Sequence, residues 1–396
     1  MRYSAACNTI GDSRKALEQA CAVVRDGLDG DTPDLAVVFV SAHHAGFEEV
    51  PALIAERLGA RHLIGCTCET VIGGGEEMED RPAVSLWTAV MPGVEIAACH
   101  AEFERTPDGL LCSGMPLAAE VGFPVGAAIF LGDPYTCAAK SLIARIADDH
   151  PGVPLMGGMA SSGNAPGENR LYIDGRVVNR GGVGVLIGRG VSVRSVVSQG
   201  CRPVGVPFVI TKSDENVVHE LGGVPAMLRL QEIFDAAGER DQRLLQRGPH
   251  VGLAIDEHRS EFGRGDFLIS GVLGGDRATG ALALGNVVRT GQTLQFHVRD
   301  ADAADEDLRS LITTQLESGE RPQGALLFSC NGRGTRMFAE TNHDAGVIQD
   351  LAGPIPLAGF FAQGELGPIS GSNHLHGFTA SLALFGSSPA GSEHDD

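Results

Sequence analysis

The residue best suited to carry chemistry in this chain is Cys330, which follows an apolar run and opens the loop Asn331-Gly332-Arg333-Gly334. Backbone N–H groups of a Gly-rich loop and a nearby guanidinium both lower the pKa of a thiol. Cys330 is therefore a candidate reactive or ligand-contacting thiol. The alternative is a small apolar residue that completes a core strand, which is the role of most free cysteines.

Arg333 lies between two glycines, Gly332 and Gly334, in the same loop. A guanidinium in that position can bind a carboxylate or phosphate through two parallel hydrogen bonds. We therefore predict that Asn331, Arg333 and Gly334 contribute to a ligand site with Cys330. The alternative is a solvated loop arginine.

A second candidate segment follows two aromatic residues, Phe360 and Phe361, which could form the wall of a pocket. Gln363 and Glu365 come directly after them, and Glu365 could hold a ligand ammonium group. Arg333 and Glu365 together would suit a zwitterion such as an amino acid. The alternative is that Phe360 packs in the core and Glu365 caps a turn.

His374 and His376 are two residues apart, so on a strand both would face one side, and we include them in the predicted ligand site. Asn342, His343 and Asp344 lie upstream, but two histidines without a matched carboxylate motif do not define a metal site. We predict no metal and no cofactor, and expect His343 and Asp344 to organise a loop or cap a helix.

The elements that must position these residues form one pattern that occurs three times. Each copy is an apolar strand, a helical stretch, a Leu/Ile-x-Gly step and a Gly-rich turn. The first strands are expected at 35–40, 127–131 and 325–330, and the second strands end near 66, 158 and 360. Repeated strand–helix–strand units predict an α/β fold with mixed β-sheets, with α+β as an alternative.

Open α/β sheets bind ligands at the carboxyl ends of their strands, so the three loops after the first strands are the candidate mouth of the site. Cys330 lies in the third loop. His43 and His44 lie in the first, and Asp133, Tyr135 and Cys137 in the second. We expect Asp133 to be a turn residue.

Further elements follow from periodicity and turn residues. Helices are expected at 12–26 and 305–317, and helical stretches near 217–221 and 228–234. Strands are expected at 82–90, 94–99, 184–187, 191–197, 252–255, 267–272 and 293–298. Asp174-Gly175 indicates a two-residue hairpin turn. The polar stretch 239–249 is predicted to be a surface loop.

Composition excludes several classes of protein. The formal net charge of −20 argues against nucleic acid and anionic membranes as partners, because both require clustered Lys and Arg. The 9 cysteines are odd in number and include no CxxC, so neither a disulfide framework nor a zinc site is expected. The N-terminus lacks the apolar core of a signal peptide, and no apolar run approaches membrane-spanning length. These features predict a cytoplasmic, reduced protein.

Several of these motifs together resemble the FIST family. Gly65-Cys66-Thr67 with Gly73-Gly74-Gly75, Met156-Gly157-Gly158 and the run 199–205 resemble its N-terminal portion. Cys330-Asn331-Gly332-Arg333-Gly334, the run 359–368 and His374-Leu375-His376 resemble its C-terminal portion. The resemblance covers roughly residues 30–385 and divides the chain into a helix and lead-in at 1–29, portions at 30–224 and 225–386, and an acidic tail at 387–396, predicted to be disordered.

The resemblance implies two interlocked portions that form a sensory module for a small ligand, such as an amino acid, which passes its signal on. No output domain is recognisable, so a signal must travel through a protein partner or a homo-oligomer. We therefore expect a binding protein rather than an enzyme. Two alternatives stay open: a protein-interaction scaffold without a small ligand, and a cysteine enzyme in which His374 or His376 supplies the base for Cys330.

Overall fold

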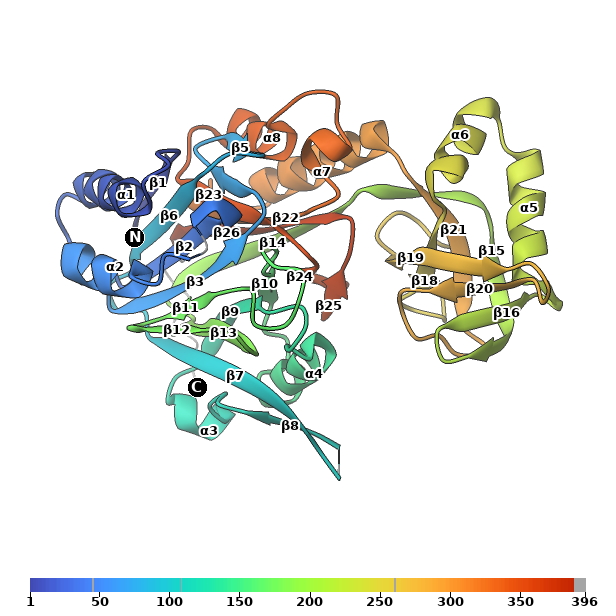
Figure 1. Cartoon of the computed structure of the whole chain (residues 1–396), viewed down its shortest axis with the longest axis horizontal. Helices are drawn as coiled ribbons and strands as arrows, with labels where there is room; N and C mark the ends of the chain where they lie inside the picture. The colour runs from blue at the N-terminus through green and yellow to red at the C-terminus, as the bar shows by residue number, and fades with distance from the viewer. Residues whose placement is uncertain (45, 108, 260, 388–396) are drawn as a thin grey trace. The chain divides into compact units, whose positions relative to one another are not determined.

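The computed structural model describes residues 1–44, 46–107, 109–259 and 261–387 (Figure 1). The predicted disordered tail therefore lies outside the described residues, apart from Ser387. The chain forms two compact units. Unit 1 comprises Met1–Val197, Leu308–Leu375 and the residues from Thr379 onward, and unit 2 comprises Ser198–Asp307 and His376–Phe378. The chain leaves unit 1 within a strand and returns to it within a helix.

Unit 1 contains the three predicted strand–helix–strand repeats, each with a parallel pair of strands. Repeat 1 consists of β1 (Arg2–Asn8), β2 (Leu35–Ser41), α2 (Val50–Leu58), β3 (His62–Cys68), β4 (Val71–Gly73), β5 (Glu76–Met78) and β6 (Val84–Val90). Repeat 2 consists of β7 (Ile96–Thr106), β9 (Val125–Gly132), α4 (Ala139–Asp149), β10 (Leu155–Met159), β11 (Leu171–Ile173), β12 (Arg176–Val178) and β13 (Gly182–Gly188). Repeat 3 consists of β14 (Val191–Gln199), β22 (Gly324–Cys330), α8 (His343–Ala352), β23 (Leu357–Ala362), β24 (Glu365–Ile369), β25 (Ser372–His376) and β26 (Thr379–Ser387), with unit 2 inserted after β14.

The repeats exchange their hairpins in a cycle. Each repeat builds its own sheet from its parallel pair and its last strand. The last strand runs antiparallel to the first strand of that pair: β6 to β2, β13 to β9 and β26 to β22. The hairpin that follows the parallel pair joins a different sheet: β4 pairs with β23, β11 with β3, and β24 with β10. No repeat therefore completes its sheet alone, and residues far apart in sequence meet where hairpins are exchanged.

A shared apolar core lies between the inner faces of the three sheets. Phe39, Phe328 and Phe360 meet there, with the ring centroids of Phe39 and Phe360 5.0 Å apart. Alternate residues of the same strands, such as Val38 and Leu327, point outward beneath helices. The strands are buried on both faces, which explains their continuous apolar runs.

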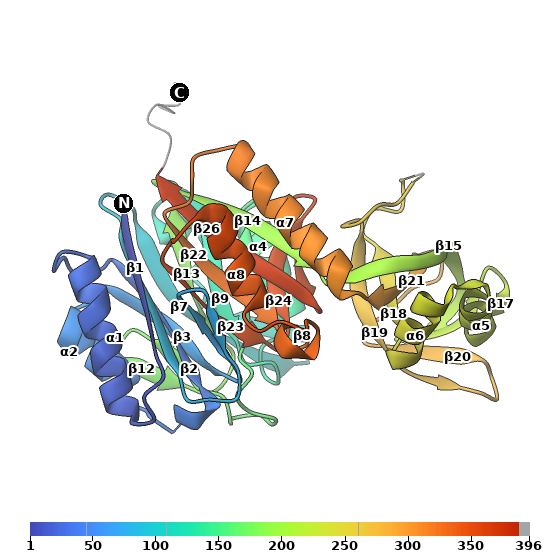
Figure 2. The same cartoon turned by 90° about the horizontal axis from the view of Figure 1, so that it is seen from above.

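Helices cover the outer face of each sheet. α1 (Ser13–Gly27) and α2 pack on the first sheet, α4 on the second, and α7 (Ala301–Glu317) and α8 on the third, as Figure 2 shows for α7 and α8. Asp12 caps α1 by accepting the N–H of Lys15. Two further elements of repeat 2 are β8 (Gly109–Ser113) and α3 (Ala118–Val121).

The Leu/Ile-x-Gly step has a steric cause. Gly65, Gly157 and Gly359 occupy equivalent positions in the second strand of each parallel pair. An added Cβ would lie 2.3 Å from the carbonyl oxygen of Val38 at the first position, and 1.9 Å from those of Phe130 and Leu327 at the other two. Glycine is therefore required for the strands to approach each other this closely.

Unit 2 is a closed antiparallel barrel. Its strands run in the order β15-β21-β18-β19-β20-β16, and β15 also pairs with β16. The elements are β15 (Cys201–Asp214), β16 (Val217–Leu221), β17 (Val224–Pro225), α5 (Ala226–Ala236), α6 (Glu239–Arg247), β18 (His250–Ala254), β19 (Phe267–Asp276), β20 (Ala281–Leu284) and β21 (Thr293–Arg299). His250 and His297 are buried in it, and burial lowers the pKa of each to about 4.

Most predicted elements are confirmed, including the helix from residue 13, the hairpin at Asp174-Gly175 and the strands of unit 2. Two predictions were wrong. Residues 217–221 form strand β16, which pairs with β15 and β20 and buries Val218 and Leu221 in the barrel core. Residues 239–247 form helix α6, a polar helix that buries Leu245 alone and has acidic residues in its first turn. In the described part of the chain, no helix is long and apolar enough to cross a membrane.

Candidate functional site

Cys330 is the last residue of β22 and lies at the carboxyl end of a parallel strand pair, opposite Ala362. The next residue, Asn331, donates its N–H to the carbonyl oxygen of Ala362 at 2.9 Å. The chain then turns, and the N–H of Gly332 donates to the Cys330 sulfur at 3.4 Å. The loop therefore starts with a partly exposed thiol that accepts a backbone hydrogen bond.

Arg333 is completely buried and pairs with Asp344, the second residue of α8. Its Nε donates to Asp344 Oδ2 at 2.6 Å, and its Nη2 donates to Oδ1 at 2.8 Å. This two-point geometry is the strongest form of Arg–carboxylate pairing. The guanidinium also lies 5.3 Å from the ring centroid of Phe338, which stacks on His343.

Asp344 is held as an anion by its surroundings. Burial alone would raise the pKa of Asp344, but the charge and hydrogen bonds of Arg333 and the contact with His343 hold it well below its ordinary range. The Ser329 hydroxyl donates to the same carboxylate at 2.8 Å. Arg333 and Asp344 therefore form a buried, charge-neutral pair between the loop after β22 and the first turn of α8.

Glu77 reaches this pair from repeat 1, on the exchanged strand β5. Its Oε1 accepts the N–H of Ala345 at 3.1 Å, at the first turn of α8, and its own N–H donates to Asn342 Oδ1 at 2.8 Å. Burial, together with the charge of Asp344, raises the pKa of Glu77 to about 8. Glu77 is therefore mostly a neutral acid at pH 7.

The end of the loop is also fastened by repeat 1. Glu79 accepts the N–H of Thr335 at 3.0 Å and its hydroxyl at 2.6 Å, and Arg336 pairs with Glu69. Gly334 has a φ of +57°, and an added Cβ would lie 2.6 Å from the ring of Phe361. Only glycine fits at this point between the loop and the core.

Glu365 approaches Cys330 from β24. Its Oε2 accepts both the N–H of Thr379, at 3.1 Å, and the Thr379 hydroxyl, at 2.8 Å. Burial raises the pKa of Glu365 to about 8, against the lowering effect of the hydrogen bonds from Thr379. We call Cys330, Arg333, Asp344, Glu77 and Glu365 the Arg333 cluster.

Four buried polar atoms in and beside the Arg333 cluster lack a hydrogen-bond partner among the described residues. They are Arg333 Nη1, Glu77 Oε2, Glu365 Oε1 and the side-chain oxygen of Asn331. Buried polar groups are almost always hydrogen-bonded in native proteins, because an unpaired one costs about 1–3 kcal/mol. One N–H donor and three side-chain oxygens are therefore available to a polar group that enters the cluster.

The structure brings five of the predicted site residues together and places the other five elsewhere. Cys330, Asn331, Arg333, Gly334 and Glu365 come together at the end of β22. Phe360 lies in the shared core, Phe361 packs against Gly334, and Gln363 is exposed. His374 belongs to unit 1 and is half-buried, which lowers its pKa, whereas His376 belongs to unit 2.

Sequence reasoning missed Glu77, Glu79 and Thr379, and it assigned Asp344 to a loop or cap rather than to Arg333. The acidic run at 76–80 follows a glycine triplet and looks like a solvated turn. Its burial depends on the pairing of β4 with β23, which no local pattern encodes. Among the described residues, no group of three or more His, Cys, Asp and Glu is placed to hold a metal ion.

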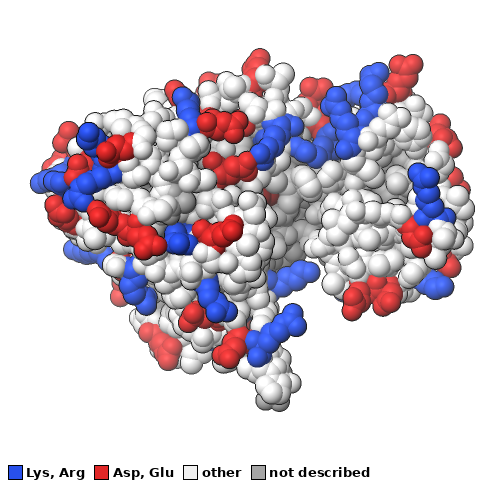
Figure 3. Space-filling model, viewed as in Figure 1, with Lys and Arg blue, Asp and Glu red and all other residues white. Residues whose placement is uncertain are grey.

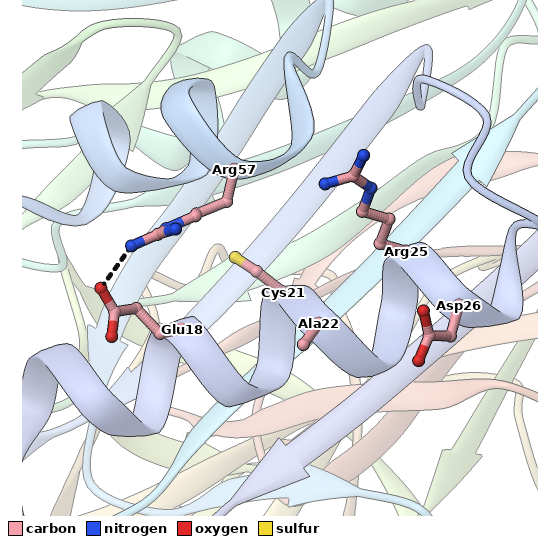
Figure 4. A pocket seen from close by; sticks show the side chains of 6 residues that line it. All are labelled: Glu18, Cys21, Ala22, Arg25, Asp26 and Arg57. Atoms are coloured by element: carbon pink, nitrogen blue, oxygen red, sulfur yellow. Dashed lines mark hydrogen bonds and ion pairs between the residues drawn. The ribbon is translucent and has the colours of Figure 1, made fainter.

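Two surface grooves lie elsewhere on unit 1. One, of about 380 Å³, runs between α1 and α2, where Arg57 bonds to Glu18 beside Cys21 (Figure 4). The other, of about 790 Å³, is lined by Tyr3–Ala5, Gly74, Gly75 and the end of α8. Neither contains a predicted site residue. Acidic and basic side chains are interspersed on the face of unit 1 drawn in Figure 3.

The fold is a repeated α/β fold, and comparison with known families identifies the family to which the chain belongs. The model of the FIST N domain matches residues 34–224, and that of the FIST C domain matches residues 226–368. The chain belongs to the FIST family. FIST domains are associated with signal transduction and sensing. Unit 1 draws residues from both matched regions.

The chain is also similar to uncharacterized mycobacterial proteins over nearly its whole length. One, from Mycobacterium tuberculosis, is 44% identical over 387 residues, which cover 97% of this chain and 100% of the relative. Another, from Mycobacterium bovis, is 42% identical over 389 residues, covering 97% and 99% of the two chains.

Proposed function

We propose that this protein is a sensor that binds a small polar metabolite, such as an amino acid, at the Arg333 cluster and acts on a partner protein in signal transduction. The observation that carries the proposal is the buried guanidinium of Arg333, whose Nη1 has no partner among the described residues. A cation kept inside the core with one unused donor is suited to an incoming anion.

The chemistry of the cluster suits a zwitterion. A ligand carboxylate would accept from Arg333 Nη1, and a ligand ammonium would donate to the unused oxygens of Asn331 and Glu77. An ammonium beside Glu77 favours its ionised form, which opposes the raised pKa of that carboxyl. Below pH 8, binding of an amino acid should therefore release a proton from Glu77.

The loop itself offers a route for the signal. Arg333 is 0% exposed, so a ligand reaches it only when the loop moves. The loop is held by Glu69 and Glu79, through Arg336 and Thr335, and these contacts are exposed. A ligand that favours one loop arrangement shifts the population toward it, and a partner that contacts the exposed loop would detect the change.

A thermal-shift screen of the purified chain against the standard amino acids and small carboxylates tests the proposal. Binding to the native state alone stabilises it by about 2.7 kcal/mol at a ligand concentration of 100 times Kd. For a unit of this size we expect a rise in midpoint of about 5 °C. The rise should be lost in Asn331→Ala and in Arg333→Lys, which keeps the charge but not the Nη1 donor.

Asn164→Ala is the matched control, because Asn164 is exposed on the loop after β10 of repeat 2. It should respond to the ligand as the wild type does. If no compound raises the midpoint, or if Asn331→Ala responds fully, the ligand does not bind at the Arg333 cluster and the proposal fails.

A further inference from the structure

The larger of the two surface grooves of unit 1, of about 790 Å³, lies beside β1 and α8. Its lining includes Tyr3–Ala5 of β1 and Gly346, Gln349 and Asp350 of α8. Gln349 fixes the segment that follows α8, because its side-chain amide donates to the carbonyl oxygen of Ile355 at 2.9 Å and accepts the Ile355 N–H at 3.0 Å. The groove is therefore formed by ordered elements of the fold.

The hydrogen-bond pattern of the first sheet shows which backbone groups of β1 point away from it. β6 lies between β1 and β2, and the carbonyl oxygen of its residue Ala89 accepts the N–H of Asp34, directly before β2, at 2.8 Å. Successive residues of a strand direct their N–H and C=O groups to opposite sides, so Thr88 bonds to its partner Ser4 in β1. The Thr88 hydroxyl also donates to the Ser4 carbonyl oxygen, at 3.1 Å. The backbone of Ser4 therefore faces β6.

The two neighbours of Ser4, Tyr3 and Ala5, therefore direct their N–H and C=O groups to the outer edge of β1. Among the described residues, β1 is the last strand of its sheet, whereas β7, the equivalent strand of repeat 2, has the further strand β8 beyond it. A strand edge with unpaired backbone groups is a template for an added strand. β1 thus presents two donors and two acceptors where its residues line the groove.

The charge of the groove restricts what can bind there. Among the described residues that line it, Asp350 alone carries a charge, and its exposed carboxylate makes no ion pair with another described residue. The chain as a whole has a formal net charge of −20, which opposes the approach of an acidic partner. A segment that carries Lys or Arg complements both features.

We propose that the groove beside β1 binds an extended, basic segment of a partner protein, which adds a strand to the outer edge of β1. The backbone groups of Tyr3 and Ala5 hydrogen-bond to the segment, and Asp350 pairs with one of its cationic side chains. This inference goes beyond the proposed amino-acid site and does not depend on it. α8 begins at the Arg333 cluster and then lines the groove, so the two sites share a helix.

The test is to pan a phage library of random short peptides against the whole chain and to measure the affinity of a selected synthetic peptide. We expect the selected peptides to be rich in Lys and Arg. Gly346→Leu should weaken binding at least about 10-fold, because a Cβ at this position enters open space in the groove and the larger side chain obstructs it. Asp350→Asn should weaken binding by about 2–5-fold.

Gly11→Leu is the matched control. A Cβ at Gly11 also meets open space, and Gly11 precedes α1, whereas the groove residue Gly27 ends that helix. This variant should bind the peptide as the wild type does. Methylation of single backbone nitrogens of the peptide should weaken binding at least about 5-fold at alternate positions only, since every second residue of an added strand bonds to β1.

The inference is overturned if no peptide is selected, or if the selected peptides bind Gly346→Leu as tightly as the wild type. It is also overturned if the effects of N-methylation do not alternate along the peptide. If the wild type is a dimer by light scattering and Gly346→Leu is a monomer, a second copy of the chain occupies the groove and the inference is wrong. The amino-acid screen reports on the Arg333 cluster and is unaffected by these results.

Discussion

Asp344→Asn removes the negative charge that neutralises Arg333 inside unit 1. Arg333 and Asp344 are both 0% exposed, and breaking such a pair by removing one partner costs about 3–5 kcal/mol. Glu77 changes this outcome. The charge of Asp344 helps to raise the pKa of Glu77 to about 8, and Arg333 lowers it. Without Asp344, Glu77 should ionise and become the new counter-ion.

The magnitude follows from that replacement. The pKa of Glu77 is about 8, one unit above pH 7, so ionising Glu77 at pH 7 costs about 1.4 kcal/mol while Asp344 is present. Asp344→Asn alone should therefore lose less than the full cost of an unpaired arginine. Glu77→Gln alone should be nearly neutral at pH 7, because Gln resembles the protonated acid. The double variant should lose about 1–3 kcal/mol more than the sum of the two.

Urea unfolding monitored by the fluorescence of Trp87 measures this coupling. Trp87 is the one tryptophan of the chain and is buried in the core of unit 1, so its signal follows that unit. Asp133→Asn combined with Glu77→Gln is the control. Asp133 is equally buried but does not act on Glu77, so these two changes should add within about 0.5 kcal/mol. Additivity of the Asp344 and Glu77 changes to the same degree would refute the account of the cluster.

Three further outcomes are expected. Gly359→Ala should destabilise unit 1 by about 3 kcal/mol in urea unfolding, because its Cβ would lie 1.9 Å from the Leu327 carbonyl oxygen. Gly346→Ala, where a Cβ on α8 would meet open space, should instead stabilise the unit by about 0.5–1 kcal/mol. Equal effects of the two substitutions would be inconsistent with the packing described. The stability of the wild type relative to Glu365→Gln should fall as pH rises from about 4.5 to 8, by up to about 1.4 kcal/mol per pH unit. The reason is that the carboxyl ionises in the unfolded chain over this range but keeps its proton in the folded one. A difference in unfolding free energy between the two proteins that does not change with pH, measured in urea, would contradict this. Unit 2 should lose stability as pH falls from about 6.5 to 4, because His250 and His297 are neutral when folded and take up protons when unfolded, and faster hydrogen exchange at 250–254 and 293–298 would show it.

The three repeats could be predicted from sequence because each carries a local signal. Apolar strands, helical spacing and an invariant step at Gly65, Gly157 and Gly359 recur, and the step has a single steric cause. The placement of Cys330 at the end of a strand followed from the same pattern. The strand at 217–221 was mistaken for a helix because the spacing of its apolar residues, Val217, Val218 and Leu221, fits a helix as well as a strand.

The partners of the site could not be predicted, because they are brought there by hairpin exchange. Glu77 lies in an acidic turn that gives no sign of burial, yet it contacts Ala345 of repeat 3. Thr379 opens the last strand and orients Glu365 across a different sheet. Arg333 and Asp344 are 11 residues apart, within reach of sequence reasoning, but only the fold shows that both are completely buried.

Hydrogen–deuterium exchange, with and without a ligand from the screen, tests the central claim most directly. The account predicts slower exchange confined to the loop at 331–338 and the first turn of α8, where Arg333, Asn331 and Glu77 meet the ligand. The protection should disappear in Asn331→Ala and persist in Asn164→Ala. Protection centred instead on the groove between α1 and α2, or on unit 2, would contradict the claim that the Arg333 cluster is the ligand site.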